Sequence, residues 1–149
     1  TEIYTLSLHD ALPIFLAVYM PIVAGMGGNA GTQTLAVLVR GIALKQIELK
    51  TAWPTIKKEI LAGIINGAIT GVLVAIVVIL VNRDIKIALV LAMAMIINLL
   101  VAGFFGALIP LIMKKLGKDP ATSATIFITT ATDVLGFIAF LGLATLILR

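Results

Sequence analysis

Asp133 is the residue whose type and position point most directly to chemistry. It lies near the middle of Ala121–Leu148, a run of 28 residues that contains no other charged residue and no proline. Because a helix needs about 20 apolar residues to cross a bilayer, this run predicts a membrane span with Asp133 near its centre. An ionised carboxylate that faces lipid there costs at least ~2.5–3.5 kcal/mol. We therefore expect a proton, a cation or a polar cavity beside it.

A polar stripe runs along the same predicted helix. Its members recur at intervals of three or four residues, which places them on one helical face. They are Thr122, Thr125, Thr129, Asp133 and Gly136. A threonine stripe that ends at a carboxylate favours a water-lined path. The alternative is a protonated Asp133 that is hydrogen-bonded to a neighbouring helix.

A second set of oxygen donors lies in the first predicted span. Pro21 and four glycines fall within eleven residues, and this composition predicts that the first span is broken at the Gly-rich segment. The segment Gly25–Gln33, GMGGNAGTQ, also carries Asn29, Thr32 and Gln33. Amide and bare carbonyl oxygens are donors that hard cations prefer. The alternative is that the glycines only allow a neighbouring helix to pack closely.

The residue inventory argues against an enzyme. An intramembrane aspartyl protease needs two facing carboxylates, and the predicted spans contain only Asp133. The chain has one histidine and no cysteine. This excludes a two-histidine metal site within one chain and gives no sign of zinc or thiol chemistry. No phosphate-binding GxGxxG or GK[ST] pattern accompanies the glycines.

One carboxylate becomes more useful in a symmetric homodimer, the commonest oligomer. Two copies of Asp133 on a central axis would give a charge of −2, which matches a divalent cation. Mg²⁺ requires an octahedral oxygen shell and gives up its waters reluctantly, so a few carboxylates, hydroxyls and carbonyls around a partly hydrated ion would suit it. Two charges that move inward gain roughly 4.6 kcal/mol per 100 mV, so influx needs no second ion and no ATP.

Composition predicts the elements that position these residues. Hydrophobic residues make up 61% of the 149 residues and charged residues 12%, and the mean hydropathy is +1.20, outside the soluble range. Each of four uncharged stretches is long enough to span a bilayer. They are Ala11–Val39, Ile60–Asn82, Ile87–Met113 and Ala121–Leu148. We expect an all-α membrane protein, a polytopic helical bundle with about four transmembrane helices per chain.

The cations are divided unevenly between the predicted loops. Eight lie in the first and third connections, and three lie in the second connection and at the C-terminus. The positive-inside rule therefore predicts that the first and third connections are cytoplasmic and that both termini lie outside. This distribution explains the net charge of +4 without a nucleic-acid partner. The outward N-terminus suggests that something preceding it is missing.

Small and polar residues elsewhere predict helix packing. Gly63, Gly67 and Gly71 form a small-residue face on the second span, which allows close approach of another helix. Asn98, alone in the third span, is expected to form a helix–helix hydrogen bond. Asp119, directly before a proline, fits the N-cap of the last helix. Trp53, also followed by a proline, fits an interfacial anchor at a helix start.

Two characteristic segments resemble a known family. PIVAGMGGNAGTQTLAVLVRGIAL (Pro21–Leu44) resembles the most characteristic segment of the MgtE-type magnesium transporters. KKLGKDPA (Lys114–Ala121), followed by TTATDVLGF (Thr129–Phe137), is similar to the last span of that family. The resemblance extends from about Leu16 to the C-terminus.

The resemblance implies a homodimeric, magnesium-selective channel of the inner or plasma membrane, with five spans per subunit. By position, Asp133 matches the pore carboxylate of the family. Asn29 and the backbone from Gly25 to Gly28 match a broken helix that lines the same pore, and Thr129 lies one turn before Asp133 on the pore side. Mg²⁺ would be the transported ion, bound in the pore.

The chain also departs from the family pattern. The first span and the cytosolic parts, an acidic domain, paired CBS domains and a plug helix, have no counterpart in this sequence. Many members have a proline where this chain reads Ser123–Ile126. Residues 1–14 resemble translated sequencing-adapter read ends and are set apart as a doubtful segment. Residues 15–149 are expected to form a transmembrane ion-permeation domain, a fragment without its regulatory gate.

The expected function is a magnesium or divalent cation channel or transporter that moves Mg²⁺ down its electrochemical gradient through a pore at the homodimer axis. Two alternatives stay open at this point. One is transport of another divalent cation, or export coupled to Na⁺ or H⁺. The other is a non-conducting membrane assembly module, in which Asp133 only holds helices together.

Overall fold

The computed structural model describes residues 8–48 and 52–148, and within these ranges it forms four α-helices and no strand. The helices are α1 (Leu8–Ala43), α2 (Trp53–Asn82), α3 (Ile85–Lys115) and α4 (Pro120–Ile147). All four are long and apolar enough to cross a membrane. The predicted all-α bundle with about four spans is therefore confirmed.

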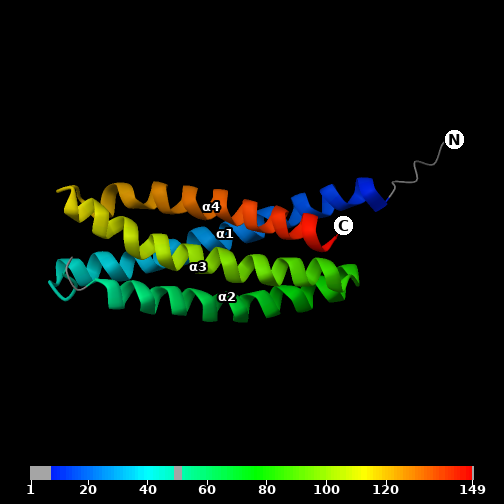
Figure 1. The fold of residues 1–149 in the computed structure, drawn as a ribbon, viewed down its shortest axis with the longest axis horizontal. Coiled ribbons are helices and arrows are strands. Elements are labelled where there is room, and N and C mark those ends of the chain that lie inside the picture. Colours follow the sequence, from blue (N-terminus) through cyan, green and yellow to red (C-terminus); the bar gives the residue numbers. More distant parts are fainter. Residues whose placement is uncertain (1–7, 49–51, 149) are drawn as a thin grey trace.

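The helices run alternately up and down the bundle (Figure 1). The connections α1–α2 and α3–α4 lie at one end, and the short α2–α3 turn lies at the other end. α3 is the central helix, because 56% of its span is buried, compared with 28% or less for the other three. α3 packs against all three neighbours, and α1 packs mainly on α3 and α4. Consecutive helices α1 and α2 are thus not each other's main partners.

Local sequence signals set where the later helices begin. α2 starts at Trp53 with a proline in its first turn, as expected. The side chain of Asp119 accepts a hydrogen bond from the Ala121 amide at 2.9 Å, which confirms the predicted N-cap of α4. Asp84 caps α3 in the same way by accepting from the Lys86 amide at 2.8 Å. Each carboxylate satisfies an amide that the first helical turn leaves unpaired.

α1 corrects one prediction. The first span is not broken at the Gly-rich segment, because α1 is helical without interruption from Leu8 to Ala43. The propensity penalty of glycine applies to helices in water. In a membrane, the continuous helix pairs the backbone groups internally. Contacts with other helices also favour it: a Cβ at Gly27 would overlap Asn98 of α3, and a Cβ at Gly31 would overlap Ile128 of α4.

The small-residue face of α2 packs against α3, as predicted. A Cβ at Gly67 would lie 2.7 Å from the Ile96 Cα, and a Cβ at Gly71 would lie 2.9 Å from the Ala92 carbonyl oxygen. Gly103 of α3 approaches the backbone of α2 at Glu59 in return. These glycines bring the two backbones into contact, which is how membrane helices gain packing energy without a hydrophobic driving force.

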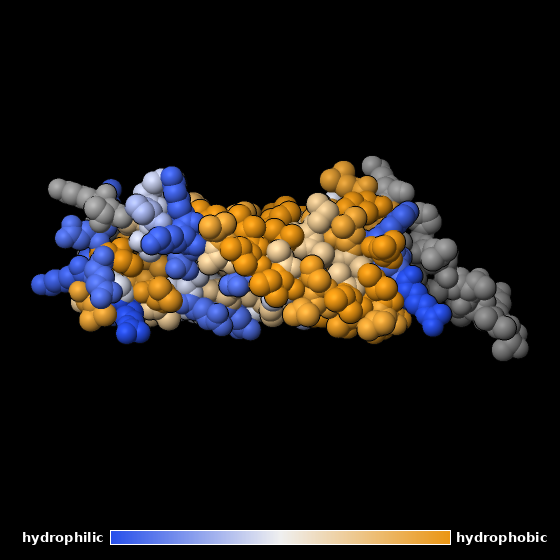
Figure 2. All heavy atoms as spheres, turned by 90° about the horizontal axis from the view of Figure 1, so that it is seen from below, coloured by the Kyte–Doolittle hydropathy of each residue, from blue (hydrophilic) through white to orange (hydrophobic). Residues whose placement is uncertain are grey.

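The outer surface is apolar between two polar ends. Figure 2 shows hydrophilic residues gathered mainly at one end and a smaller group toward the other, with a largely hydrophobic surface between them. On α2, the exposed fractions of Leu73, Val77 and Leu80 are 58%, 58% and 75%. Such exposure of large aliphatic side chains suits a lipid environment.

Candidate functional site

Asp133 lies on α4 within the candidate span Ala124–Ile147 and is half-buried. Within the described part of the chain, its carboxylate accepts no hydrogen bond and forms no ion pair. None of the described groups of the four helices therefore holds this side chain by a polar contact.

The threonines near Asp133 donate their hydroxyl hydrogens to backbone carbonyl oxygens of α4. Thr129, half-buried and one turn before Asp133, donates to the carbonyl oxygens of Thr125 at 3.0 Å and Ile126 at 3.1 Å. Buried Thr132 donates to the Thr129 carbonyl oxygen at 3.0 Å. A hydroxyl that donates to its own helix can still accept with its oxygen lone pairs. The half-buried Thr129 oxygen is then suited to a cation or its hydration waters, whereas Thr132 is fully buried.

The predicted polar stripe is only partly open. Thr125, Thr129 and Asp133 are half-buried. Gly136 is buried, and a Cβ there would lie 2.8 Å from the Asn98 side chain. The side chain of Thr122 lies outside the described ones. The open part of the stripe therefore reaches Asp133 and stops one turn later, where α4 packs on α3.

The two predicted glycines of α1 have different surroundings, and only Gly28 lies near α4. A Cβ at Gly28 would lie 3.7 Å from Cγ2 of Thr129, so the structure brings these two predicted residues together. Gly25 is exposed, and no atom lies within 4 Å of the position of its Cβ. In a continuous helix their carbonyl oxygens accept hydrogen bonds internally. Gly28 also accepts from the Thr32 hydroxyl at 2.9 Å, so its carbonyl is not bare.

Asn29 lies on a different side of α1. It is exposed and lines a cavity together with Asn66 and Thr70 of α2. Neither Asp133 nor Thr129 lines that cavity. The structure therefore separates the five predicted site residues: Gly28, Thr129 and Asp133 lie toward the α1–α4 side, Asn29 lies toward α2, and Gly25 is exposed with no neighbour beside it.

Asn29 belongs to a larger polar depression, which we call the α1–α2 groove. It consists of two adjoining cavities of about 180 and 280 Å³, which share Gln33 of α1 and Asn66 of α2. Leu99 of α3 lies along both cavities. The groove exists because α1 packs on α3 and α4, leaving its α2 side uncovered.

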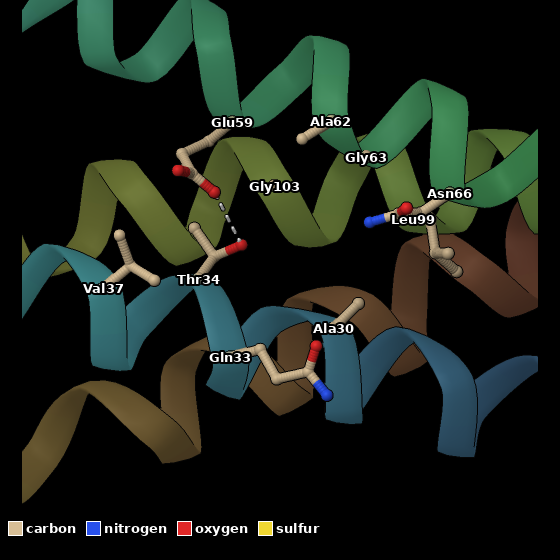
Figure 3. A pocket seen from close by; sticks show the side chains of 10 residues that line it. All are labelled: Ala30, Gln33, Thr34, Val37, Glu59, Ala62, Gly63, Asn66, Leu99 and Gly103. Atoms are coloured by element: carbon tan, nitrogen blue, oxygen red, sulfur yellow. Dashed lines mark hydrogen bonds between the residues drawn. The ribbon is translucent and has the colours of Figure 1, made fainter.

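Glu59 lies at the end of this groove nearer the α1–α2 connection. Figure 3 shows Glu59 projecting from α2 toward Thr34 of α1, whose hydroxyl donates to Oε2 of Glu59 at 3.2 Å. Glu59 is half-buried and Thr34 is 9% exposed. The cavity beside Glu59 is thus lined by a carboxylate, the amides of Gln33 and Asn66, and a hydroxyl.

Sequence reasoning missed Glu59. The uncharged stretch that predicts the second span begins at Ile60, directly after Glu59. The structure continues α2 back to Trp53, which makes Glu59 part of the same helix as Asn66. The signal that reveals it is the helical spacing of Glu59, Gly63, Asn66 and Thr70, at intervals of four, three and four residues.

Asn98 forms the interhelical hydrogen bond that the sequence predicts. Its Nδ2 donates to the Val23 carbonyl oxygen of α1 at 2.6 Å, and the side chain is fully buried. Asn98 also contacts Gly27 of α1 and Gly136 of α4. Its Oδ1 has no hydrogen-bond partner among the described residues. Asn98 therefore links α3 to the two helices that carry Gly28 and Asp133.

The donor groups of the described residues can be compared with the ligands that different metal ions prefer. Among the described residues, no group of three or more His, Cys, Asp or Glu side chains lies together. The available donors are isolated carboxylates surrounded by neutral oxygens. Such a set does not resemble a closed transition-metal site. It suits a hard divalent cation that keeps part of its hydration shell.

Comparison with known proteins also points to a divalent cation. Residues 20–143 match the protein family MgtE, described as a divalent cation transporter. The chain is 39% identical over 134 residues to the magnesium transporter MgtE of Enterococcus faecalis, covering 90% of this chain and 30% of that protein. It is 37% identical over 139 residues to the MgtE of Bacillus subtilis, covering 92% and 31%. For the MgtE of Thermus thermophilus the identity is 28% over 134 residues. The chain thus spans about 30% of the length of the curated relatives that it matches.

Proposed function

The chain belongs to the MgtE family of divalent cation transporters, and from this membership we propose that residues 15–149 form the ion-permeation domain of a magnesium transporter. The family is one of transporters and not of enzymes. The four candidate spans make the chain a multi-pass membrane protein. Three relatives named as magnesium transporters support Mg²⁺ as the transported ion. Because the chain covers about 30% of these relatives, the proposal concerns the part that it matches.

The unpartnered carboxylate of Asp133 carries the proposal. It lies within a candidate span and has no polar partner in the described part of its own chain. Uncompensated charge at that depth is costly, so the functional assembly must supply a partner. A second copy that presents the same face would place two Asp133 side chains across an axis, as isologous contacts require.

The ion would pass between these two carboxylates. Their combined charge of −2 matches one Mg²⁺, which binds through a few carboxylates while keeping several waters. The Thr129 oxygens, one turn away and free to accept, would receive hydrogen bonds from those waters. The membrane potential supplies roughly 4.6 kcal/mol per 100 mV for a divalent cation that moves inward.

Replacement of the carboxylate by its neutral isostere tests this proposal. We expect Asp133→Asn to lower Mg²⁺ uptake at least roughly tenfold in liposomes containing a magnesium-sensitive dye, since one charged ligand contributes about 1.5–3 kcal/mol. Asp119→Asn is the matched control, because asparagine also caps a helix and flux should be unchanged. Normal conduction by Asp133→Asn would contradict the charge-matching argument.

The same preparation separates the two alternatives. Size-exclusion chromatography with light scattering, applied to the detergent-solubilised protein, reports whether Asp133→Ala still forms a dimer. Loss of flux with an intact dimer supports the pore, whereas loss of the dimer supports the assembly module. Flux that depends on an imposed Na⁺ or H⁺ gradient would identify coupled export.

A further inference from the structure

We propose that the α1–α2 groove is a second binding site for the transported cation, in which a hydrated divalent cation is held at Glu59. The proposal rests on the proposed transport function but concerns a different carboxylate on a different pair of helices. It assigns Glu59 as the charged ligand and the neutral side chains of the groove as acceptors for the hydration shell.

Glu59 has the properties that such a ligand needs. One of its oxygens, Oε2, accepts the Thr34 hydroxyl at 3.2 Å, which fixes the orientation of the carboxylate. No cation pairs with Glu59 among the residues that the structure describes. Glu59 is six residues beyond the start of α2 at Trp53, roughly 9 Å along the helix axis. A half-buried carboxylate at this depth remains charged at low cost only if water or a cation reaches it.

The rest of the groove suits a hydrated ion better than a bare one. Gln33 and Asn66 line both cavities and offer amide oxygens, which accept hydrogen bonds from water. The cavity beside Glu59 measures about 180 Å³, which leaves room for several waters. One carboxylate plus retained waters is a usual way for proteins to bind Mg²⁺.

The polar residues of the α1–α2 groove extend from Glu59 toward the middle of the bundle, the level at which Asp133 lies. From Glu59 to Thr70 they follow one face of α2 for eleven residues, roughly 16 Å. The inner part of the groove includes Asn29 of α1, the residue directly after Gly28, which lies beside Thr129. A cation at Glu59 would therefore lie nearer than Asp133 to the end of the bundle that carries the α1–α2 and α3–α4 connections (Figure 1).

Trp53 provides a built-in probe for this site. It is the only tryptophan in the chain, and it lies in the first turn of α2, about 9 Å along the axis from Glu59. Mn²⁺ is a paramagnetic divalent cation that quenches nearby indole fluorescence. Titration of Mn²⁺ into the chain in zwitterionic lipid nanodiscs should give saturable quenching of Trp53, which Mg²⁺ reverses.

Two matched substitutions decide the assignment. Glu59→Gln should weaken the apparent Mn²⁺ affinity at least roughly tenfold, the loss expected for one charged ligand. Glu48→Gln removes an exposed carboxylate at the same end and should leave the titration unchanged. Equal quenching in Glu59→Gln and the unsubstituted chain overturns the proposal, as does an equal loss in Glu48→Gln. Linear, unsaturable quenching of the unsubstituted chain also overturns it, because such quenching reports collisions with free Mn²⁺ and no bound ion.

Further variants keep the result interpretable. If Glu59→Gln does not give a monodisperse protein, Thr34→Val serves in its place, since it removes only the hydroxyl that orients the carboxylate and should weaken Mn²⁺ binding several-fold. Asp133→Asn should retain the Trp53 quenching. If Asp133→Asn conducts normally, the pore proposal fails while the Trp53 titration still decides the groove site.

Discussion

Within the described part of the chain, the side-chain amide of Asn98 forms a hydrogen bond through its nitrogen but not through its oxygen. Nδ2 donates to the Val23 carbonyl oxygen, while Oδ1 has no partner among the described residues. Gly27 and Gly136 enclose the side chain from α1 and α4. Only glycine permits such close contact, because a Cβ at either position would overlap the amide. Asn98 therefore fixes the spacing of the helices that carry Gly28 and Asp133.

Removal of this amide should loosen the bundle. We expect Asn98→Ala to lower the free energy of unfolding by about 1–3 kcal/mol. The lost interhelical hydrogen bond contributes about 0.6 and at most about 1.7 kcal/mol, and the cavity that the shorter side chain leaves adds the rest. Unfolding in mixed micelles of increasing denaturing-detergent content measures the change.

Thr145→Ala is the comparison for that measurement. The Thr145 hydroxyl donates only within its own helix, to the Gly142 carbonyl oxygen at 2.7 Å, so its loss should change stability little. Equal stability of Asn98→Ala and the unsubstituted chain would show that the amide is not a structural link.

At the scale of the element, α1 is continuous because of its neighbours. Its glycines differ in surroundings: Gly31 packs directly against Ile128, whereas nothing lies within 4 Å of a Cβ at Gly25. Identical substitutions at these two positions should therefore have different effects. Overpacking costs about 1–3 kcal/mol where space is lacking, as at Gly31, and costs nothing where the added methyl group meets no atom, as at Gly25.

We accordingly expect Gly31→Ala to lower the thermal stability of the purified protein and Gly25→Ala to leave it unchanged. Thermal denaturation followed by circular dichroism in detergent measures both. A stabilised Gly31→Ala would mean that α1 and α4 can separate at this point, and hence that their contact is weaker than the structure implies.

Predictability from sequence also depends on the surroundings of each element. The helix start at Asp119 and the packing glycines of α2 were predictable, because capping and close approach depend on short-range patterns. The break in α1 was wrongly predicted, because glycine propensities reflect water and not contact with Asn98 and Ile128. Glu59 was missed, because the predicted span was limited to uncharged residues and so began at Ile60. The helix itself continues through Glu59 without a change in backbone geometry.

The candidate site was predictable in part for the same reason. One charge in an apolar run identifies Asp133 without any structure, and Thr129 follows from helical spacing. The division of Asn29 from Asp133 was not predictable, because it depends on how α1 is rotated against α3 and α4. Rotation about a helix axis follows from tertiary packing, and the Gly-rich face of α1 has no strong hydrophobic stripe that specifies it.

At the scale of the whole molecule, both basic connections lie at one end of the bundle (Figure 1). The positive-inside rule then predicts that this end is cytoplasmic. Because the chain contains no cysteine, single cysteines report orientation without background. In intact cells, a membrane-impermeant maleimide should label Lys86→Cys at the α2–α3 end and should label Lys118→Cys only after the cells are permeabilised. The reverse pattern would mean that the bundle is inserted in the opposite orientation.

The central position of α3 has a consequence for biogenesis. Of these four helices, α1 is synthesised first, yet its main partners, α3 and α4, are synthesised after α2. α2 and α3, joined by the two residues between Asn82 and Ile85, can instead form a helical hairpin as soon as both are inserted. α1 must therefore remain against lipid or the insertion machinery until that hairpin is complete. Assembly of these four helices then starts with α2 and α3, and α1 joins them late.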